Sequence, residues 1–381
     1  MVDFTLTDEQ KALREMAHDF AAKEMRPVAW EYDKDGTWPE EILKKAWELG
    51  IMNSHIPEEY GGPGASYFDG CLIEEELGWG CSGIGTSIAC NGLATAPLML
   101  GGSDELKREY LGRLTEEPRL ASFCLTEPDA GSDVSGMKTN AVRQGDKWVI
   151  NGSKCFITNG GYADWYTVYA KTDKEAGHRG ISAFVVPREA GVIVDKKEDK
   201  MGQRASNTAT ITFNDVEIPA ENLIGEENKG FKLAMMTLDR TRPGVAAMAV
   251  GIARAAFEFA TEYSKERVQF GVPIAMHQAI QFMIADSAIE LKAARLLVYE
   301  TAWKADQGLD IRDDSYMAKI FACETATRVV DRSLQVHGGI GLTRELPLEY
   351  WYRQVRGIRI TEGVTEVLRW RLARNLLRAR G

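Results

Sequence analysis

The first candidate for chemistry is Glu362, a carboxylate in the mostly apolar stretch Ile360-Thr361-Glu362-Gly363-Val364. If this carboxylate were buried beside a flat ligand, its pKa would rise and it would act as a general base near neutral pH. Judged without any other information, the same residue is better explained as a glutamate at the start of a helix, where it favours the helix dipole. The sequence around Glu362 leaves both interpretations open.

A second candidate is the loop Leu125-Thr126-Glu127-Pro128-Asp129-Ala130-Gly131-Ser132-Asp133, which follows an apolar strand at 121–125. Pro128 restricts one backbone angle, and Gly131 allows conformations that are closed to other residues. Thr126 and Ser132 add short hydroxyl groups. Such a loop can direct N–H groups and hydroxyls at the edge of a heterocycle, although its composition alone favours an ordinary surface turn.

The elements that would position these residues fall into three parts. Residues 1–120 have helical spacing, and Thr7 with Gln10 forms a capping box at the start of the first helix. Residues 121–226 contain alternating and β-branched segments, and Asn151-Gly152 predicts the turn of a hairpin. Residues 227–381 are rich in Ala, Leu and Met at helical spacing. The sequence therefore predicts an α+β chain with a β domain between two helical domains.

Composition argues against several other classes of protein. The chain has 381 residues with 46 Lys+Arg against 56 Asp+Glu, a net charge of −10 that argues against nucleic acid and anionic membranes as partners. No uninterrupted apolar run reaches membrane-spanning length, and no targeting peptide is recognisable, so we expect a cytoplasmic protein, or a mitochondrial matrix protein if this is a processed form. The six Cys form no CxxC pair and the five His have no ligand spacing, so we expect reduced thiols and no metal site.

Six segments along the chain, in this order, resemble the acyl-CoA dehydrogenase family. They are Ile56-Pro57-Glu58-Glu59-Tyr60-Gly61-Gly62, the loop 125–133, Gly152-Ser153-Lys154-Cys155-Phe156-Ile157-Thr158-Asn159-Gly160, Arg267-Val268-Gln269-Phe270-Gly271, Gln335-Val336-His337-Gly338-Gly339 and Thr361-Glu362-Gly363. The segments Tyr110-Leu111-Gly112-Arg113-Leu114-Thr115-Glu116-Glu117-Pro118 and Lys200-Met201-Gly202-Gln203-Arg204 are most similar to the medium-chain branch.

The resemblance implies an N-terminal helical domain, a β-barrel-like middle domain and a C-terminal four-helix bundle. It further implies an oxidoreductase of fatty acid β-oxidation that uses FAD to convert an acyl-CoA, short- to medium-chain, into the trans-2-enoyl-CoA. The electrons would pass to an electron-transfer flavoprotein, and the enzyme would be a homo-oligomer, a tetramer by resemblance.

The resemblance also assigns roles to single residues. Glu362 would abstract the α-proton; the family's other position for the base holds Thr241, which cannot do so. The FAD-binding residues would be Phe123, Leu125, Thr126, Gly131, Ser132, Phe156, Ile157, Thr158, Val364 and Glu366, and, toward the FAD of a neighbouring subunit, Arg267, Gln269, Phe270, His277, Gln278, Gln335, Gly338 and Gly339. The substrate would be bound by Ser132, Asp239, Arg242 and Gly363.

Some positions depart from the family pattern and leave other activities open. Thr361, Val364, Gln354, Ile358 and Ala89 replace the family's usual residues, which puts the acyl chain length and the shape of the pocket in doubt. An acyl-CoA oxidase that passes electrons to O₂, or a nitroalkane-oxidase-like enzyme, is the nearest alternative. A DNA-associated relative is another, because the C-terminal stretch carries the arginine stripe Arg371, Arg374 and Arg378, although the net charge of −10 opposes it.

Overall fold

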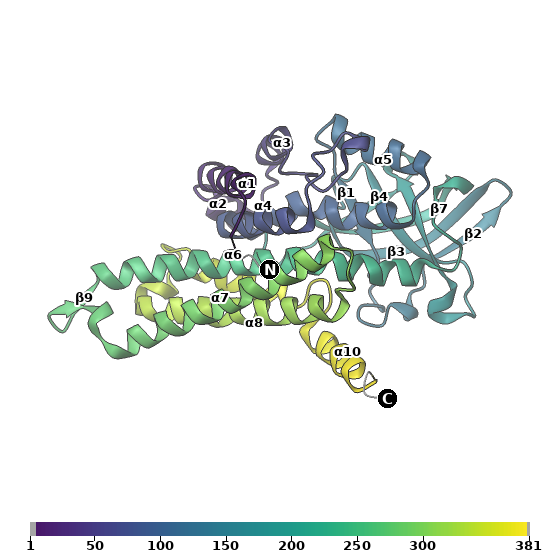
Figure 1. Ribbon diagram of the computed structural model, residues 1–381. Helices are drawn as coiled ribbons and strands as arrows, with labels where there is room; N and C mark the ends of the chain where they lie inside the picture. The colour runs from purple at the N-terminus through teal and green to yellow at the C-terminus, as the bar shows by residue number, and fades with distance from the viewer. Residues whose placement is uncertain (1–4, 379–381) are drawn as a thin grey trace.

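The computed structural model describes residues 5–378, and Figure 1 shows helical parts at both ends of the chain with a β domain between them. The first helical part contains α1 (Asp8–Phe20), η1 (Ala21–Met25), α2 (Ala29–Asp35), α3 (Glu40–Glu48), η2 (Glu58–Tyr60), α4 (Tyr67–Gly101) and α5 (Asp104–Glu116). Thr7 forms the predicted capping box with Gln10. Long helix α4 bends at Cys81, whose backbone is extended (φ −163°, ψ 110°), so the glycine-rich segment around it is a kink within one helix.

The β domain is an open, mostly antiparallel sheet. Its strands are β1 (Ala121–Cys124), β2 (Asn140–Gln144), β3 (Lys147–Thr158), β4 (Trp165–Lys171), β5 (Ile181–Pro187), β6 (Ile193–Lys197), β7 (Thr208–Pro219) and β8 (Leu223–Ile224), with short 3-10 turns η3 (Val134–Gly136), η4 (Gly177–Gly180), η5 (Arg188–Ala190) and η6 (Ala220–Asn222). The strand order is β6-β7-β3-β2-β4-β5-β8, and β1 pairs with β4 in parallel. Because β6 and β8 are the two edges, the sheet does not close into a barrel.

The predicted hairpin turn at Asn151-Gly152 is wrong. Both residues lie inside the single strand β3, where the register against β7 shifts between Ile150 and Gly152. Gly152 has a φ of 146°, and a Cβ there would lie 2.4 Å from the Thr139 hydroxyl, so the glycine serves a β-bulge at a close backbone approach. The true turn is at Gly145-Asp146, between β2 and β3.

The C-terminal part is a bundle of long helices. It contains α6 (Gly230–Glu266), the hairpin β9 (Val268–Gln269) and β10 (Val272–Pro273), η7 (Ile274–Met276), α7 (Gln278–Asp306), α8 (Arg312–His337), η8 (Gly338–Leu342), α9 (Leu348–Ile358) and α10 (Thr365–Arg378). Helices α6, α7, α8 and α9 pack together as the predicted four-helix bundle, while α10 projects away from it in Figure 1.

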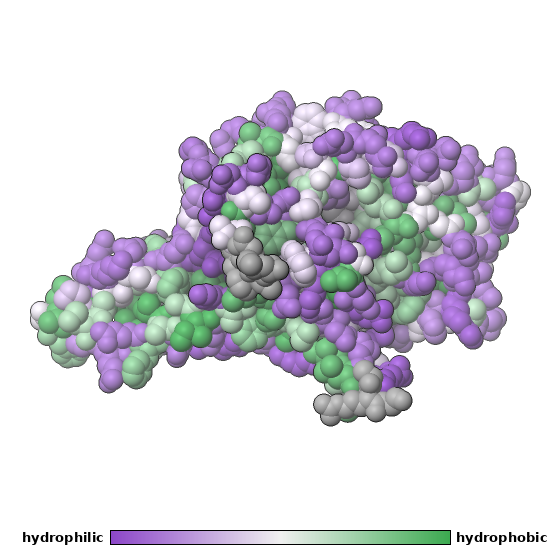
Figure 2. All heavy atoms as spheres, in the orientation of Figure 1, coloured by the Kyte–Doolittle hydropathy of each residue, from purple (hydrophilic) through white to green (hydrophobic). Residues whose placement is uncertain are grey.

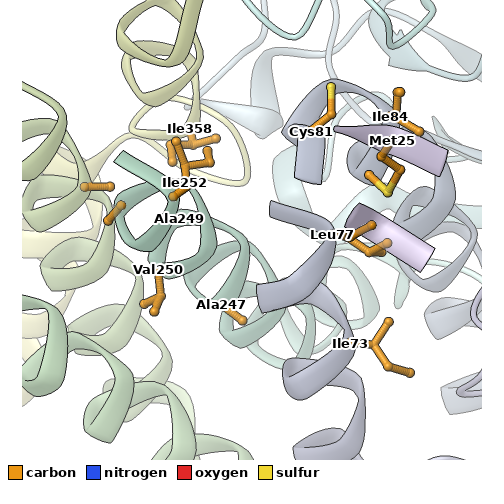
Figure 3. Packing of buried hydrophobic residues seen from close by; sticks show 14 of the residues in the cluster. Met25, Ile73, Leu77, Cys81, Ile84, Ala247, Ala249, Val250, Ile252 and Ile358 are labelled. Carbon is orange, nitrogen blue, oxygen red and sulfur yellow. The ribbon is translucent and has the colours of Figure 1, made fainter. Parts of the chain in front are cut away.

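The main core lies where α4 packs against α6 and the bundle. Figure 3 shows the helix α4, which carries Ile73, Leu77 and Ile84, near the helix α6, which carries Ala247, Val250 and Ile252, and all six side chains are buried. Small residues allow the two helices to approach closely: a Cβ on Gly78 would lie 2.2 Å from the carbonyl of Met248. Both helices are long and apolar enough to cross a membrane, but 61% and 67% of their most apolar windows are buried in the protein, as in core helices of globular folds.

Candidate active site

A cavity of about 1580 Å³ lies between α4, the middle sheet, α6 and the segment that leads into α10. Thirteen of the residues predicted to bind cofactor or substrate, or to act as base, line it: Phe123, Leu125, Thr126, Gly131, Ser132, Phe156, Ile157, Thr158, Asp239, Arg242, Glu362, Gly363 and Val364. The fold therefore brings the loop after β1, the end of β3, the first turns of α6 and the Glu362 segment to one place.

A buried ion pair holds the loop after β1 in position. The Lys154 ammonium, fully buried, lies 2.8 Å from Glu127 Oε1 and donates to the Leu125 carbonyl at 3.1 Å. Glu127 also accepts the backbone N–H groups of Lys138 (2.6 Å) and Thr139 (3.0 Å). Burial alone would raise the pKa of Glu127, but Lys154 and these donors lower it, so the carboxylate stays ionised. This pair was not predicted from the sequence; the position of Lys154 before the apolar run Cys155-Phe156-Ile157 is the signal that could have indicated a buried lysine.

The wall formed by β1, its loop and β3 suits a planar heterocycle with polar edges. Phe156 is 64% exposed toward the cavity and has a φ of 58°, a conformation rare for a residue other than glycine. Thr126, Ser132 and Thr158 line the same cavity, and within residues 5–378 their hydroxyls have no hydrogen-bond partner. Aromatic faces beside unpaired hydroxyls fit the isoalloxazine ring of FAD, which has an apolar face and a polar rim.

Glu362 lies in a turn and not at the start of a helix, because α10 begins at Thr365. Its Oε2 accepts a 2.7 Å hydrogen bond from Thr241 Oγ1, and its backbone carbonyl accepts one from Arg242 Nε at 3.0 Å. Its φ of 52° is sterically unfavourable for a glutamate, which is typical of functional sites. Burial raises the pKa of Glu362, while Thr241, Arg242 and Lys319 oppose that rise.

Lys319 of α8 holds the Glu362 turn in place through two hydrogen bonds. This side chain is fully buried, and its ammonium donates to the carbonyls of Arg359 (3.0 Å) and Gly363 (2.9 Å), on either side of Glu362. The residues around it in α8, Ala318 and Ala322, are buried and apolar. A lysine on the apolar face of a helix is a signal that could have identified it from the sequence.

Asp239 and Arg242 form an ion pair inside α6, with Arg242 Nη1 2.8 Å from Asp239 Oδ1. The pair is largely shielded from solvent, because only 5% of the Arg242 side chain and 16% of the Asp239 side chain are exposed. Burial raises the pKa of Asp239, and Arg242 and Arg312 act against this rise. Asp239 thereby holds the Arg242 guanidinium in place beside the Glu362 turn.

The remaining predicted residues do not line this cavity. Glu366 lies in the first turn of α10, and the others are Arg267, Gln269, Phe270, His277, Gln278, Gln335, Gly338 and Gly339. These eight gather at the far end of the bundle, where Ile274 packs with Val336; Figure 1 shows β9 there, remote from β1 and β3. One protomer therefore carries two separate groups of predicted FAD-binding residues. Within residues 5–378, no group of three or more His, Cys, Asp or Glu side chains could hold a metal ion.

Known protein families and relatives match nearly the whole chain. The acyl-CoA dehydrogenase N-terminal, middle and C-terminal domains match residues 7–118, 122–216 and 228–377. The probable acyl-CoA dehydrogenase YngJ of Bacillus subtilis is 44% identical over 99% of this chain and 100% of its own length.

Two solved structures share the fold closely. Butyryl-CoA dehydrogenase from Megasphaera elsdenii has a TM-score of 0.96 and 42% identity, and the match covers 99% of this chain and 100% of that one. A chain in the structure of the electron transferring flavoprotein of Acidaminococcus fermentans has a TM-score of 0.96 and 44% identity with the same coverage. This chain therefore belongs to the acyl-CoA dehydrogenase family, which consists of FAD-containing oxidoreductases.

Proposed function

We propose that this protein dehydrogenates a short- to medium-chain acyl-CoA between Cα and Cβ, with Glu362 as the base. The observation that carries the proposal is the position of Glu362: it lines the same cavity as the flavin-type wall of Phe156 and Thr158. FAD, when bound, supplies the redox chemistry by accepting the hydride from Cβ. The protein supplies alignment, proton transfer and electrostatics.

Proton removal next to a thioester needs a base and a stabilised enolate. Burial raises the pKa of Glu362, so its carboxylate is a stronger base than an exposed glutamate. The backbone N–H of Glu362 has no hydrogen-bond partner within residues 5–378, so it is available to donate to the thioester oxygen. Arg242, whose guanidinium lies against the Glu362 carbonyl, favours the developing negative charge.

Thr241 supports the assignment and gives a prediction about pH. Its hydroxyl donates to the Glu362 carboxylate and thereby lowers the pKa of that carboxyl. We expect Thr241→Val to raise this pKa further, so the acid limb of the profile of kcat/KM against pH should move to higher pH, because the basic form is lost sooner as pH falls. Thr241→Ser, which keeps the hydroxyl, is the control. An unmoved limb in the valine variant would show that another group controls the profile.

We propose an electron-transfer flavoprotein as the electron acceptor. The support is the structural similarity to a chain in the electron transferring flavoprotein structure of Acidaminococcus fermentans. An oxidase would instead reduce O₂ rapidly and release peroxide. Turnover with an artificial one-electron dye but little peroxide in air would favour the dehydrogenase.

The test of the proposed function is an anaerobic visible spectrum of the FAD-loaded protein before and after addition of butyryl-CoA or octanoyl-CoA. Bleaching of the oxidised flavin bands, with formation of the 2-enoyl-CoA, would support it. A flavin spectrum that no straight-chain, branched or substituted acyl-CoA changes would refute acyl-CoA dehydrogenation while leaving the family assignment intact.

We further propose that two protomers complete each FAD site. The far end of the bundle exposes apolar side chains, among them Phe270 (94% exposed), Met276, Phe282 and Ile289, and Figure 2 shows apolar surface gathered at this end. Such a patch is typical of an interface with another protein chain. A second copy covering it would bring Arg267 and Gln269 to the FAD of its neighbour, which fits a homo-oligomer.

We expect Arg267→Ala to weaken FAD binding by ~10- to 100-fold, the loss of one charge-assisted hydrogen bond to a phosphate. The effect should occur although Arg267 does not line the cavity that contains Phe156. FAD affinity can be measured by fluorescence titration of the apoprotein. Lys265→Ala, an exposed residue of the same helix end, is the control; equal affinities in both variants would contradict the shared site.

A further inference from the structure

Three consecutive glutamates on α4 have different surroundings. Glu75 pairs with Arg295 at 2.8 Å and with Arg254 at 3.2 Å, and Glu76 pairs with Arg254 and with His18. Glu74 has neither a salt bridge nor a hydrogen bond within residues 5–378, although it lines the cavity that contains Glu362. An unpaired carboxyl in an active-site cavity needs an explanation, because leaving it unpaired is unfavourable.

The structure makes room for this carboxyl at Gly244 of α6. A Cβ at Gly244 would lie 2.1 Å from Glu74 Oε2, so the carboxyl group rests directly on the helix backbone where any other residue would displace it. Gly244 lies three residues after Thr241, on the same face of α6, about one helical turn of ~5 Å along the axis. Since Thr241 binds Glu362, Glu74 lies about one turn away from the proposed base.

No Lys, Arg or His side chain within residues 5–378 forms an ion pair with Glu74, although Arg242 lines the same cavity. Leu77, Ala89, Cys90 and Met248 line the same cavity and are apolar or nearly so. Burial, together with the nearby Glu362 carboxylate, raises the pKa of Glu74 to about 8. At neutral pH the group therefore carries its proton and can donate one hydrogen bond and accept another.

We propose that Glu74 determines specificity by selecting an acyl chain that carries a neutral oxygen, a hydroxyl or a keto group, beyond the reacting Cα and Cβ. This inference rests on the proposed acyl-CoA dehydrogenation. A purely hydrocarbon chain would fill the cavity and leave Glu74 without water or any other partner. A chain with a suitably placed oxygen satisfies it, and buried polar groups left unpaired discriminate strongly between otherwise similar substrates.

The experiment uses the FAD-loaded protein and a series of matched five-carbon thioesters. Pentanoyl-, 4-hydroxypentanoyl-, 5-hydroxypentanoyl-, 5-aminopentanoyl- and glutaryl-CoA are compared by anaerobic stopped-flow reduction of the flavin. We expect a hydroxylated chain to exceed pentanoyl-CoA by ~10-fold or more in kcat/KM, the scale expected when one hydrogen bond satisfies a polar group that would otherwise be left unpaired.

Two variants of Glu74 show whether the preference depends on the hydrogen bond that its side chain donates, on its charge, or on the shape of the pocket. Glu74→Leu should reverse the order, with pentanoyl-CoA gaining and the hydroxylated chain losing, while Glu74→Gln should keep much of the preference because an amide can still donate. Glu227→Gln, at an exposed turn, is the matched control and should leave the order unchanged. FAD content and thermal unfolding show whether each variant is folded.

The outcomes distinguish the two proposals. If pentanoyl-CoA reduces the flavin and Glu74→Leu changes no ratio, the specificity role is refuted and acyl-CoA dehydrogenation stands. A preference for 5-aminopentanoyl- or glutaryl-CoA that depends on Glu74 would overturn the neutral oxygen in favour of a charged group. If no thioester reduces the flavin in any variant, the proposed function itself fails.

Discussion

Glu362→Gln is expected to lower the rate of flavin reduction by acyl-CoA by ~10³-fold or more, within the range found when a general base is removed. The amide has nearly the same shape as the carboxyl and can still accept the hydrogen bond from Thr241, but it cannot take up the α-proton. The loop 125–133 and the end of β3, which would form the flavin wall, are unchanged in this variant, so FAD should stay bound. The measurement is anaerobic stopped-flow absorbance at the oxidised flavin band.

Two further measurements make this result specific to the base. Glu345→Gln, an exposed glutamate before α9, should reduce the flavin at the rate of the unmodified protein. The Glu362 variant should still bind acyl-CoA, seen as a perturbation of the flavin bands without bleaching. A variant that retains activity within a few-fold would remove Glu362 from the role of base and direct attention to Glu74, another carboxyl that lines this cavity.

The order of the three parts could be predicted from local patterns in the sequence, whereas the residues expected to contact the flavin were assigned by the family resemblance, and the structure shows that many of them line one cavity. The capping box of Thr7 and Gln10 requires only residues close in the chain, and it is present. The alanine-rich composition after Gly230 likewise predicts long packed helices, and α6 and α8 are such helices. The strands β2 and β6 are hard to recognise from the sequence, because their exposed faces carry charged residues that weaken the alternation.

The contacts that define the site depend on residues far apart in the sequence. Thr241 and Glu362 are separated by 121 positions, and Lys154 and Glu127 by 27. Local composition carries no information about which side chains such distances bring together. Local composition was also misleading at Gly152. Asn-Gly is typical of a hairpin turn, but here Gly152 lies in a bulge inside β3, where Thr139 approaches its backbone closely.

Lys319→Met is expected to lower both the stability and the activity of the protein. The variant keeps the length and the apolar part of the side chain but leaves the carbonyls of Arg359 and Gly363 without their donor. The Gly363 carbonyl is then left without a partner, whereas the Arg359 carbonyl keeps the backbone N–H of Thr365 (3.2 Å), so the free energy of unfolding should fall by about 2 kcal/mol. Thermal or urea unfolding of the FAD-loaded protein measures this loss, and Lys292→Met, an exposed lysine on α7, is the control.

The effect of Lys319→Met on activity follows from the strain at Glu362. A φ of 52° is held only while its surroundings oppose relaxation, and Lys319 binds the carbonyls of residues on both sides of this turn. Without that restraint the carboxylate should move, and a displacement of ~1 Å is enough to slow the reaction by ~10²-fold. Because Lys319 is absent from the cavity wall, the KM for acyl-CoA should change much less than kcat. A loss confined to KM, or a loss of stability with an unchanged kcat, would show that Lys319 supports the bundle and not the geometry of the base.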